Sequence, residues 1–372
     1  MSSHYRRIIG KAVPAAVPAL VATVVAAALI PLVAATPASA AGGTSSKPSR
    51  IGLYGQQDPS FDGVYRQGLA ILALTDHGAN VNQSAVDWLL RQQCDNGRFL
   101  SFRTKLNTAC KGSDSNATAM AVMAFTSLGK NARAKEAAQW LVSKQLPSGG
   151  WGFKTQFEAD SNSTGLVAQA LIALGRNPAK VSNGGNSVFD FLRSVQLNCD
   201  DDVTGRGALD YQANTPLVAN DYATAQAAQA LARTALPVEP SAGIPDLPSM
   251  TCSAKARAVS SSAGYAAGYL GDRLNGNAGL IPNAFGPGSD FGSTMNAVLA
   301  LVASGYGSGA ASQAAAALED NARDFVLDDG NDVLPAQAGL LTLVQTATEA
   351  DPTDVDGLNL VQRIKNSITE AE

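Results

Sequence analysis

The sequence predicts an all-α protein in which six inner helices alternate with six outer helices and close into an α6/α6 toroid. Three observations predict this fold. A polar start followed by an Ala-rich apolar run recurs along the chain, a second type of segment with a central aromatic lies between its copies, and each series has six members. One helical pair cannot bury its apolar face alone, so neighbouring pairs stack, and six of them can close on themselves. An open solenoid of the same repeats is the alternative.

The inner segments share a signal for the start of a helix. In four copies a threonine follows an Asp or Asn by four residues, and an Ala/Leu/Val/Met run continues from it. A short polar side chain at that place accepts hydrogen bonds from the free N–H groups of the first turn, which predicts a capped helix. Two weaker copies, at 61–78 and 334–346, complete the set. The four aligned threonines are Thr118, Thr164, Thr224 and Thr294.

The outer segments share an aromatic followed by Leu or Val, and three of them add a glutamine five residues later. Their apolar spacing and the Gly/Asn/Asp turns that follow predict amphipathic helices. The segment 355–368 has the same helical spacing and supplies the sixth member. The shared aromatics are Trp88, Trp140, Phe191, Tyr269 and Phe325, and the glutamines are Gln93, Gln145 and Gln196.

The first 40 residues have the pattern of a signal peptide. Arg6 and Arg7 give a basic start, an apolar run fills residues 12–35, and Ala38 and Ala40 precede the expected cleavage point. We therefore expect a signal peptide at 1–40, a linker at 41–59 and the toroid domain at 60–372. The paired arginines leave the twin-arginine route open beside the Sec route, and an uncleaved membrane anchor is the alternative.

Composition limits the location and the partners. No second apolar run of about 20 residues follows the leader, so we expect a secreted, extracellular protein with no membrane span after cleavage. The formal net charge is −4 and Lys and Arg are not clustered. Phosphate binding requires such clusters, so no nucleic-acid partner is expected.

Export makes the four cysteines candidates for disulfide bonds. Cys94 and Cys110 close a short loop and are expected to pair, which leaves Cys199 to pair with Cys252. Zinc ligation is disfavoured because the chain has two histidines and neither lies near these cysteines. We therefore expect no metal site here. The acidic turns at 199–205 and 328–332 offer oxygen ligands for calcium, with plain solvated turns as the alternative.

The stretch "WLVSKQLPSGGW" (140–151) resembles the repeat of prenyltransferases and squalene cyclases, and "WLLRQQCDNGRF" (88–99) is similar. The resemblance implies the α/α-toroid superfamily. Its members include triterpene cyclases, protein prenyltransferase β-subunits, complement thioester domains and the cobalamin carriers. A shared fold does not imply a shared function, so each chemistry is tested on its residues.

The resemblance to cyclases does not extend to their catalytic acid. Squalene–hopene cyclases protonate an alkene with the middle acid of Asp-x-Asp-Asp-Thr-Ala, and Asn116 stands at that place in the segment 114–119. Asn162 stands there in the next repeat, and an amide cannot donate this proton. The inner helices also carry few aromatics to stabilise carbocations. Cyclase chemistry is therefore disfavoured, with Asp114, Asp160 or Asp221 left as non-standard acids.

The sequence lacks the residues that two other activities of the superfamily require. Prenyltransferases need a zinc site of Asp, Cys and His, and thioester domains need Gly-Cys-Gly-Glu-Gln, and neither set is present. His77 is the one histidine of the mature chain, and a solvated helix cap is its expected role. The stretch "DSNATAMAVMAFTSLG" (114–129) also resembles the inner repeat of intrinsic factor and transcobalamin, the secreted cobalamin carriers. Those carriers add a C-terminal β-domain that covers the ligand; we expect no such lid here, which argues against high-affinity cobalamin binding.

The residues two and five positions after the shared threonines mix amides with Met and Leu. If this face lines a cavity, it suits a neutral ligand with amide or hydroxyl groups; the alternative is that these side chains pack between helices. We expect no catalytic residue, cofactor or metal. The candidate ligand-binding residues are Tyr65, Asp114, Asn116, Met123, Asp160, Asn162, Gln169, Asp221, Tyr222, Gln226, Gln229, Asp290 and Asn296.

The sequence thus favours an exported, non-catalytic toroid that holds a small neutral ligand, a corrinoid or a terpenoid, in its central cavity. Two alternatives remain open. One is a terpenoid cyclase- or prenyltransferase-like enzyme with non-standard acids. The other is a scaffold without a ligand that binds a surface protein.

Overall fold

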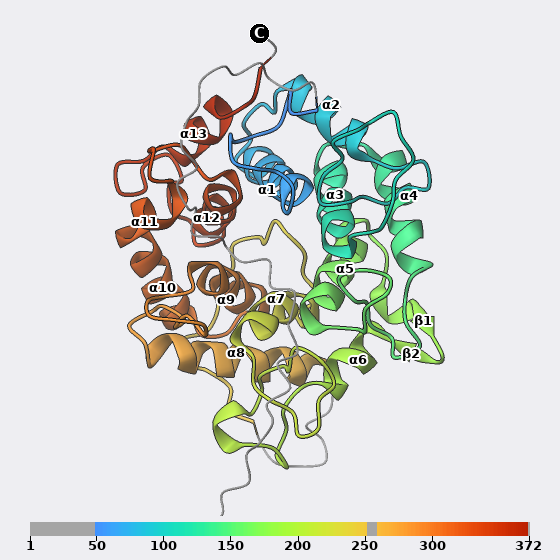
Figure 1. The fold of residues 1–372 in the computed structure, drawn as a ribbon. Coiled ribbons are helices and arrows are strands. Elements are labelled where there is room, and N and C mark those ends of the chain that lie inside the picture. Colours follow the sequence, from blue (N-terminus) through green and yellow to red (C-terminus); the bar gives the residue numbers. More distant parts are fainter. Residues whose placement is uncertain (1–48, 251–258, 371–372) are drawn as a thin grey trace, which may run out of the picture. The chain divides into compact units, whose positions relative to one another are not determined.

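The six inner helices close a ring, as the repeats predict (Figure 1). The structure is a computed structural model and describes residues 49–250 and 259–370. Each inner helix packs against the next along the chain, and the last packs against the first, so the arrangement is a closed α6/α6 toroid and not an open solenoid. The inner helices are α1 (Gly63–Asp76), α3 (Ser115–Ser127), α5 (Ser161–Ala173), α7 (Asp221–Leu231), α9 (Phe291–Ser304) and α12 (Pro335–Ala347).

Outer helices surround this ring and differ from the prediction at one place. The fifth outer segment was expected around Phe325, but α10 precedes it and α11, which holds Phe325, is only five residues long. The sequence signal missed α10 because its Ala- and Ser-rich stretch carries no aromatic. The outer helices are α2 (Gln83–Gln92), α4 (Asn131–Val142), α6 (Val188–Ser194), α8 (Val259–Asn275), α10 (Ser308–Asp320), α11 (Ala322–Val326) and α13 (Leu360–Asn366).

Small elements complete the described chain. Two short strands form an antiparallel hairpin between α5 and α6, and two 3-10 turns lie in the connecting loops. Among the described residues, no helix is long and apolar enough to cross a membrane. The strands are β1 (Ser182–Asn183) and β2 (Asn186–Ser187), and the turns are η1 (Pro178–Lys180) and η2 (Val203–Gly205).

The repeated acid or amide before four of the inner runs is an N-cap, as predicted. Asp114 accepts a hydrogen bond from the N–H of Ala117 at 2.8 Å, and Asp160 accepts one from Ser163 at 2.7 Å. Asn220 and Asp290 cap α7 and α9 in the same way, at 2.9 Å each. The caps satisfy N–H groups that a helix leaves free at its start.

The repeated threonine joins each inner helix to the loop before it. The hydroxyl of Thr118 accepts a hydrogen bond from the N–H of Phe99 at 3.0 Å and donates to the carbonyl of Asp114 at 2.6 Å. Thr164, Thr224 and Thr294 accept equivalent bonds from Trp151, Leu209 and Ile281. All four threonines are fully buried, so the hydroxyl pairs a loop N–H that water cannot reach.

The repeated glutamine joins three outer helices, α2, α4 and α6, to the next repeat. Gln145 donates from Nε2 to the carbonyl of Gly149 in its own turn and to Val181 in the following repeat. Gln93 and Gln196 each donate to two carbonyls in the same way. The glutamine repeats in the sequence because each copy makes the same contact between neighbouring pairs of helices.

Cys94 and Cys110 form the expected disulfide bond, with Cα atoms 6.0 Å apart. In the chain-entropy model, a loop of this length contributes roughly 3 kcal/mol. The second expected pair includes Cys252, which lies outside the described residues. The signal peptide expected at 1–40 also lies outside them.

The segment 49–59, in the range expected as a linker, packs against the ring. Leu53 and Tyr54 are buried. Backbone hydrogen bonds join Gly52 to Thr369 and Gly55 to Ser367, so this segment meets the end of the chain beyond α13. Ordered contacts of the toroid therefore begin before residue 60.

Candidate functional site

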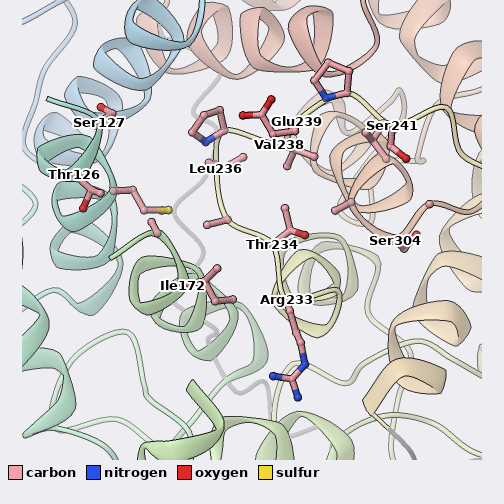
Figure 2. Close-up of a pocket in the computed structure, with 18 residues that line it drawn as sticks. Thr126, Ser127, Ile172, Arg233, Thr234, Leu236, Val238, Glu239, Ser241 and Ser304 are labelled. Atoms are coloured by element: carbon pink, nitrogen blue, oxygen red, sulfur yellow. The ribbon is translucent and has the colours of Figure 1, made fainter. Parts of the chain in front are cut away.

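A cavity of about 690 Å³ lies at the C-terminal ends of the inner helices (Figure 2). We call it the C-terminal cavity. Its walls come from α3, α5, α9 and the segment that follows α7. The lining residues are Met123, Thr126, Ser127, Ile172, Ala173, Val302, Ala303, Ser304, Gly305 and the segment 233–241. Met123 is therefore the one predicted ligand-binding residue that lines it.

The segment 233–241 crosses this end of the ring between the ends of the helices (Figure 2). Ala235, Leu236 and Val238 are buried, while Arg233 and Glu239 are exposed. The guanidinium of Arg233 lies over the ring of Phe189, 4.6 Å from its centroid. The segment then runs beside α9, where the N–H of Ile244 donates to Gly305 and the N–H of Ser308 donates to Ile244.

The cavity wall is mostly apolar, with Arg233 and Glu239 as its charged residues, and three of its hydroxyl groups already donate to the protein. Thr126 donates to the carbonyl of Val122 at 2.8 Å, Ser127 to Ala124 at 2.9 Å and Ser304 to Leu301 at 3.0 Å. Their oxygens keep lone pairs that can accept hydrogen bonds. The wall can therefore hold an apolar molecule that carries a few donor groups.

At the opposite end of the ring, several predicted residues come together at the N-terminal ends of the inner helices. We call this place the N-terminal mouth and define it by Tyr65, Asp114, Asn116, Asp160, Asn162 and Tyr222. Asn162 donates from Nδ2 to the hydroxyl of Tyr222 at 3.5 Å. Asp290 caps the next inner helix beside Tyr222.

Burial dominates the ionisation of these groups. It raises the pKa of Asp114 to about 6, against the hydrogen bonds from the backbone N–H groups of Ala117 and Asn116 and the charge of Lys154. It also raises the pKa of Asp160 to about 6. Burial raises the pKa of Tyr222 as well, and Tyr65, Tyr211, Asp160 and Asp290 add to that rise. The ionised form of a carboxyl group is unfavourable in such buried surroundings.

The amides predicted deeper in the ring join inner helices to one another. Gln169 donates to the carbonyl of Gln226 at 3.1 Å, and Gln229 donates to Oδ1 of Asn296 at 3.3 Å. Asn296 donates in turn to the carbonyl of Gly292. These bonds fit the alternative that the amides pack between helices. The side-chain oxygens of Gln169, Gln226 and Gln229 have no hydrogen-bond partner within the described ranges.

Asp221 does not join the other predicted residues. Its carboxylate accepts a hydrogen bond from Tyr269 at 2.5 Å and pairs with the guanidinium of Arg273 at 2.7 Å, both on α8. It therefore ties an inner helix to an outer one. His77 is exposed and forms the C-cap of α1, as expected.

Sequence reasoning missed the whole segment 233–241, although its composition carried a signal. The stretch 236–248 contains four prolines and no helical spacing, which marks an extended connection. Nothing in that pattern says where the connection runs. Within the described part of the chain, no group of three or more His, Cys, Asp or Glu side chains could hold a metal ion.

Comparisons with known proteins agree on the fold. A sugar epimerase from a ruminal bacterium matches with a TM-score of 0.50 and 11% identity, over 82% of this chain and 94% of the other. The type II terpene cyclase MstE from Scytonema matches with a TM-score of 0.45 and 13% identity, over 76% of each chain. A GH76 α-mannanase from Bacteroides thetaiotaomicron matches with a TM-score of 0.45 and 12% identity, over 82% and 87%.

At such low identities the comparisons show the α/α-toroid fold and transfer no activity. No protein-family model matches the chain, and no curated protein does either. The expected likeness to the cobalamin carriers finds no support in these matches.

Proposed function

We propose that this protein is an exported α/α-toroid binding protein that holds a small neutral ligand in the C-terminal cavity. The observation that carries the proposal is the cavity itself. Its volume of about 690 Å³ lies within the roughly 300–1,000 Å³ usual for sites that bind small molecules. The inner helices supply three of its walls, so the site rests on rigid elements.

The wall favours a mostly apolar ligand with a few donor groups. Met123, Ile172 and Val302 offer apolar surface, and the thioether of Met123 adapts to irregular shapes. The hydroxyls of Thr126, Ser127 and Ser304 accept hydrogen bonds while they donate to their own helices. A terpenoid alcohol has this combination of surfaces.

Export is supported by the signal-peptide pattern and by the disulfide bond. Disulfides persist in oxidising compartments and are rare in the cytosol. Cys94 and Cys110 are bonded in this protein. The disulfide bond and the cavity together support the class of secreted binding proteins.

Acid-driven cyclisation fits the N-terminal mouth less well. Protonation of an alkene requires a strong acid, whereas burial raises the pKa of Asp114 and Asp160 to about 6 and makes them weaker acids. Both carboxylates also serve as helix caps. We therefore expect no turnover of polyprenyl substrates.

Native mass spectrometry of the secreted protein tests the proposal. We expect a mass above that of the folded chain, and the difference should be a small organic molecule that solvent extraction releases. The variant Ala173→Trp places a large ring in the cavity wall and should abolish the added mass. Ala179→Trp is the matched control, because Ala179 is exposed in the turn after α5. It should keep the ligand.

Two results would contradict the proposal. Protein recovered without any small molecule, in the presence of a captured protein partner, would favour the scaffold alternative. A ligand that survives in Ala173→Trp would place the binding site elsewhere in the ring.

A further inference from the structure

The N-terminal mouth contains two buried amide oxygens without a partner. Asn116 and Asn162 occupy equivalent positions, each two residues after a capping Asp, on the neighbouring helices α3 and α5. Each side chain is 4% exposed, and Oδ1 of each has no hydrogen-bond partner among the described residues. A buried acceptor without a donor is unfavourable, because it has lost its hydrogen bond to water. Asn162 points to the mouth, because its Nδ2 meets the hydroxyl of Tyr222.

Carboxylates stand beside both amides. Asp114 and Asp160 are 3% and 2% exposed. At neutral pH a pKa of about 6 leaves most of each carboxyl ionised. Lys154 lies near Asp114, and Tyr211 and Tyr222 lie near Asp160. The mouth therefore contains more hydrogen-bond acceptors and negative charge than donors.

Two tyrosines lie in the first turns of inner helices on opposite sides of the toroid. Tyr65 is on α1 and Tyr222 is on α7, three inner helices further round the ring. Burial raises the pKa of both phenols, Tyr65 adds to the rise at Tyr222, and the Asp114 charge adds to the rise at Tyr65. Tyrosine faces attract cations through the quadrupole of the ring.

We propose that the N-terminal mouth is a second binding site, which takes the ammonium group of an organic amine. An ammonium brings three N–H donors and a positive charge. The oxygens of Asn116 and Asn162 accept these donors, and the Asp160 carboxylate balances the charge. The site lies at the other end of the inner helices from the C-terminal cavity and does not depend on the ligand proposed there.

An anion is the obvious competitor, because the N-terminal ends of helices attract negative charge. Here the carboxylates that cap the helices already occupy these positively charged helix ends. Asp114, Asp160 and Asp290 place their own carboxylates on the free N–H groups of α3, α5 and α9. The amide oxygens of Asn116 and Asn162 are acceptors, and an anion cannot satisfy them.

Exposed apolar side chains in the loops that lead to the inner helices favour an amine with an apolar substituent. Exposed apolar side chains precede four inner helices, with 44–77% of their surface accessible. They are Phe61, Phe157, Val218 and Phe285. An alkyl chain on an ammonium group in the mouth would pack against these side chains, and its apolar surface would be removed from water.

Titration calorimetry with hexylammonium tests the proposal, with hexanol and hexanoate as neutral and anionic probes of similar size. We expect saturable binding of hexylammonium and at least tenfold weaker binding of the other two. Equal binding of hexanol, a preference for hexanoate, or no saturable binding of hexylammonium would overturn the proposal.

Variants locate the site. Asp114→Asn with Asp160→Asn removes both charges and keeps the caps, since Asn220 caps α7 in the same chain. This pair should weaken binding at least tenfold, and Asn162→Leu should do so without changing the charge. Asp351→Asn is the control, because this carboxylate also accepts a backbone N–H but follows α12 at the other end of the ring. An equal loss in the control would overturn the assignment.

Acidity gives an independent readout. Ammonium binding favours ionised carboxylates, so affinity should be present above pH 6 and fall about tenfold between pH 7.5 and pH 5 as Asp114 and Asp160 take up protons. The double Asn variant should lose this dependence. Ala173→Trp should bind hexylammonium normally, so failure of the C-terminal cavity and failure of this site are distinguishable.

Discussion

At the scale of single residues, the recurring Asp or Asn and the recurring Thr have a structural role in four of the six repeats, at α3, α5, α7 and α9. The acid caps an inner helix, and the threonine hydroxyl accepts the N–H of the preceding loop while donating to the carbonyl four residues before it. One pair of side chains therefore sets where the helix begins and where the loop enters it.

The threonine contact predicts a specific loss of stability. Thr118→Val keeps the shape and leaves the buried N–H of Phe99 unpaired, which should lower the free energy of unfolding by about 1–3 kcal/mol. Urea unfolding measures the change. Thr75→Val is the control, because the Thr75 hydroxyl only donates to carbonyls of its own helix. A similar loss in both variants would contradict the role assigned to Thr118.

The buried caps predict the direction of the pH dependence. Burial raises the pKa of Asp114 from 3.8 to about 6, which corresponds to about 3 kcal/mol. The folded state then binds the proton more tightly than the unfolded state, so stability falls as pH rises from about 4 to about 6 and stays lower above that. Asp114→Asn keeps the cap and should therefore stabilise the protein more at pH 7.5 than at pH 4. Unfolding curves at both pH values measure this, and an equal effect would contradict it.

The sequence could predict the caps but not every partner of the site residues. Asp114, Asp160 and Asp290 each stand directly before an apolar run, and this spacing indicates a helix N-cap. Asp221 is predicted as a further candidate acid and ligand-binding residue. Its partners Tyr269 and Arg273 lie about 50 residues away on α8, and only the packing of the two helices brings them together.

At the scale of elements, the predicted alternation holds at the outer helices that contain Trp88, Trp140, Phe191 and Tyr269. It failed at α10, whose Ala-rich sequence looks like an inner helix and lacks that mark. It also could not place the segment 233–241, because a proline-rich connection has no periodicity to reveal which face it covers. That segment forms one wall of the C-terminal cavity.

Small residues let the inner helices approach closely. A Cβ added at Gly165 of α5 would lie 2.7 Å from the Cα of Ala227 on α7, and one added at Gly339 of α12 would lie 3.1 Å from the backbone of Leu69 on α1. The second contact joins the last inner helix to the first. Glycine at these positions therefore favours closure of the ring.

The same substitution should have opposite effects on inner and outer helices. Gly165→Ala forces α5 away from α7 and should cost about 1–3 kcal/mol. Gly309→Ala in α10 meets nothing within 4 Å and should stabilise by about 0.4–1 kcal/mol through the entropy of the unfolded chain. Thermal or urea unfolding of both variants measures the signs. Stabilisation by Gly165→Ala would contradict the close packing of the inner ring.

At the scale of the whole toroid, the two ends of the inner helices differ in chemistry. The N-terminal mouth gathers amide oxygens, carboxylates and phenols. The C-terminal cavity is mostly apolar and is crossed by the segment 233–241. Parallel inner helices produce this difference, because every capped start lies at one end and every Ala/Leu/Val end lies at the other.

The fate of the bound molecule tests the central claim that the toroid holds its ligand without transforming it. The molecule extracted from the secreted protein would be added back to ligand-free protein, incubated, and recovered for mass spectrometry. The account predicts that it binds stoichiometrically and returns with its mass and fragmentation pattern unchanged. Conversion to a product by the wild-type protein, lost in Asp114→Asn or Asp160→Asn, would contradict it.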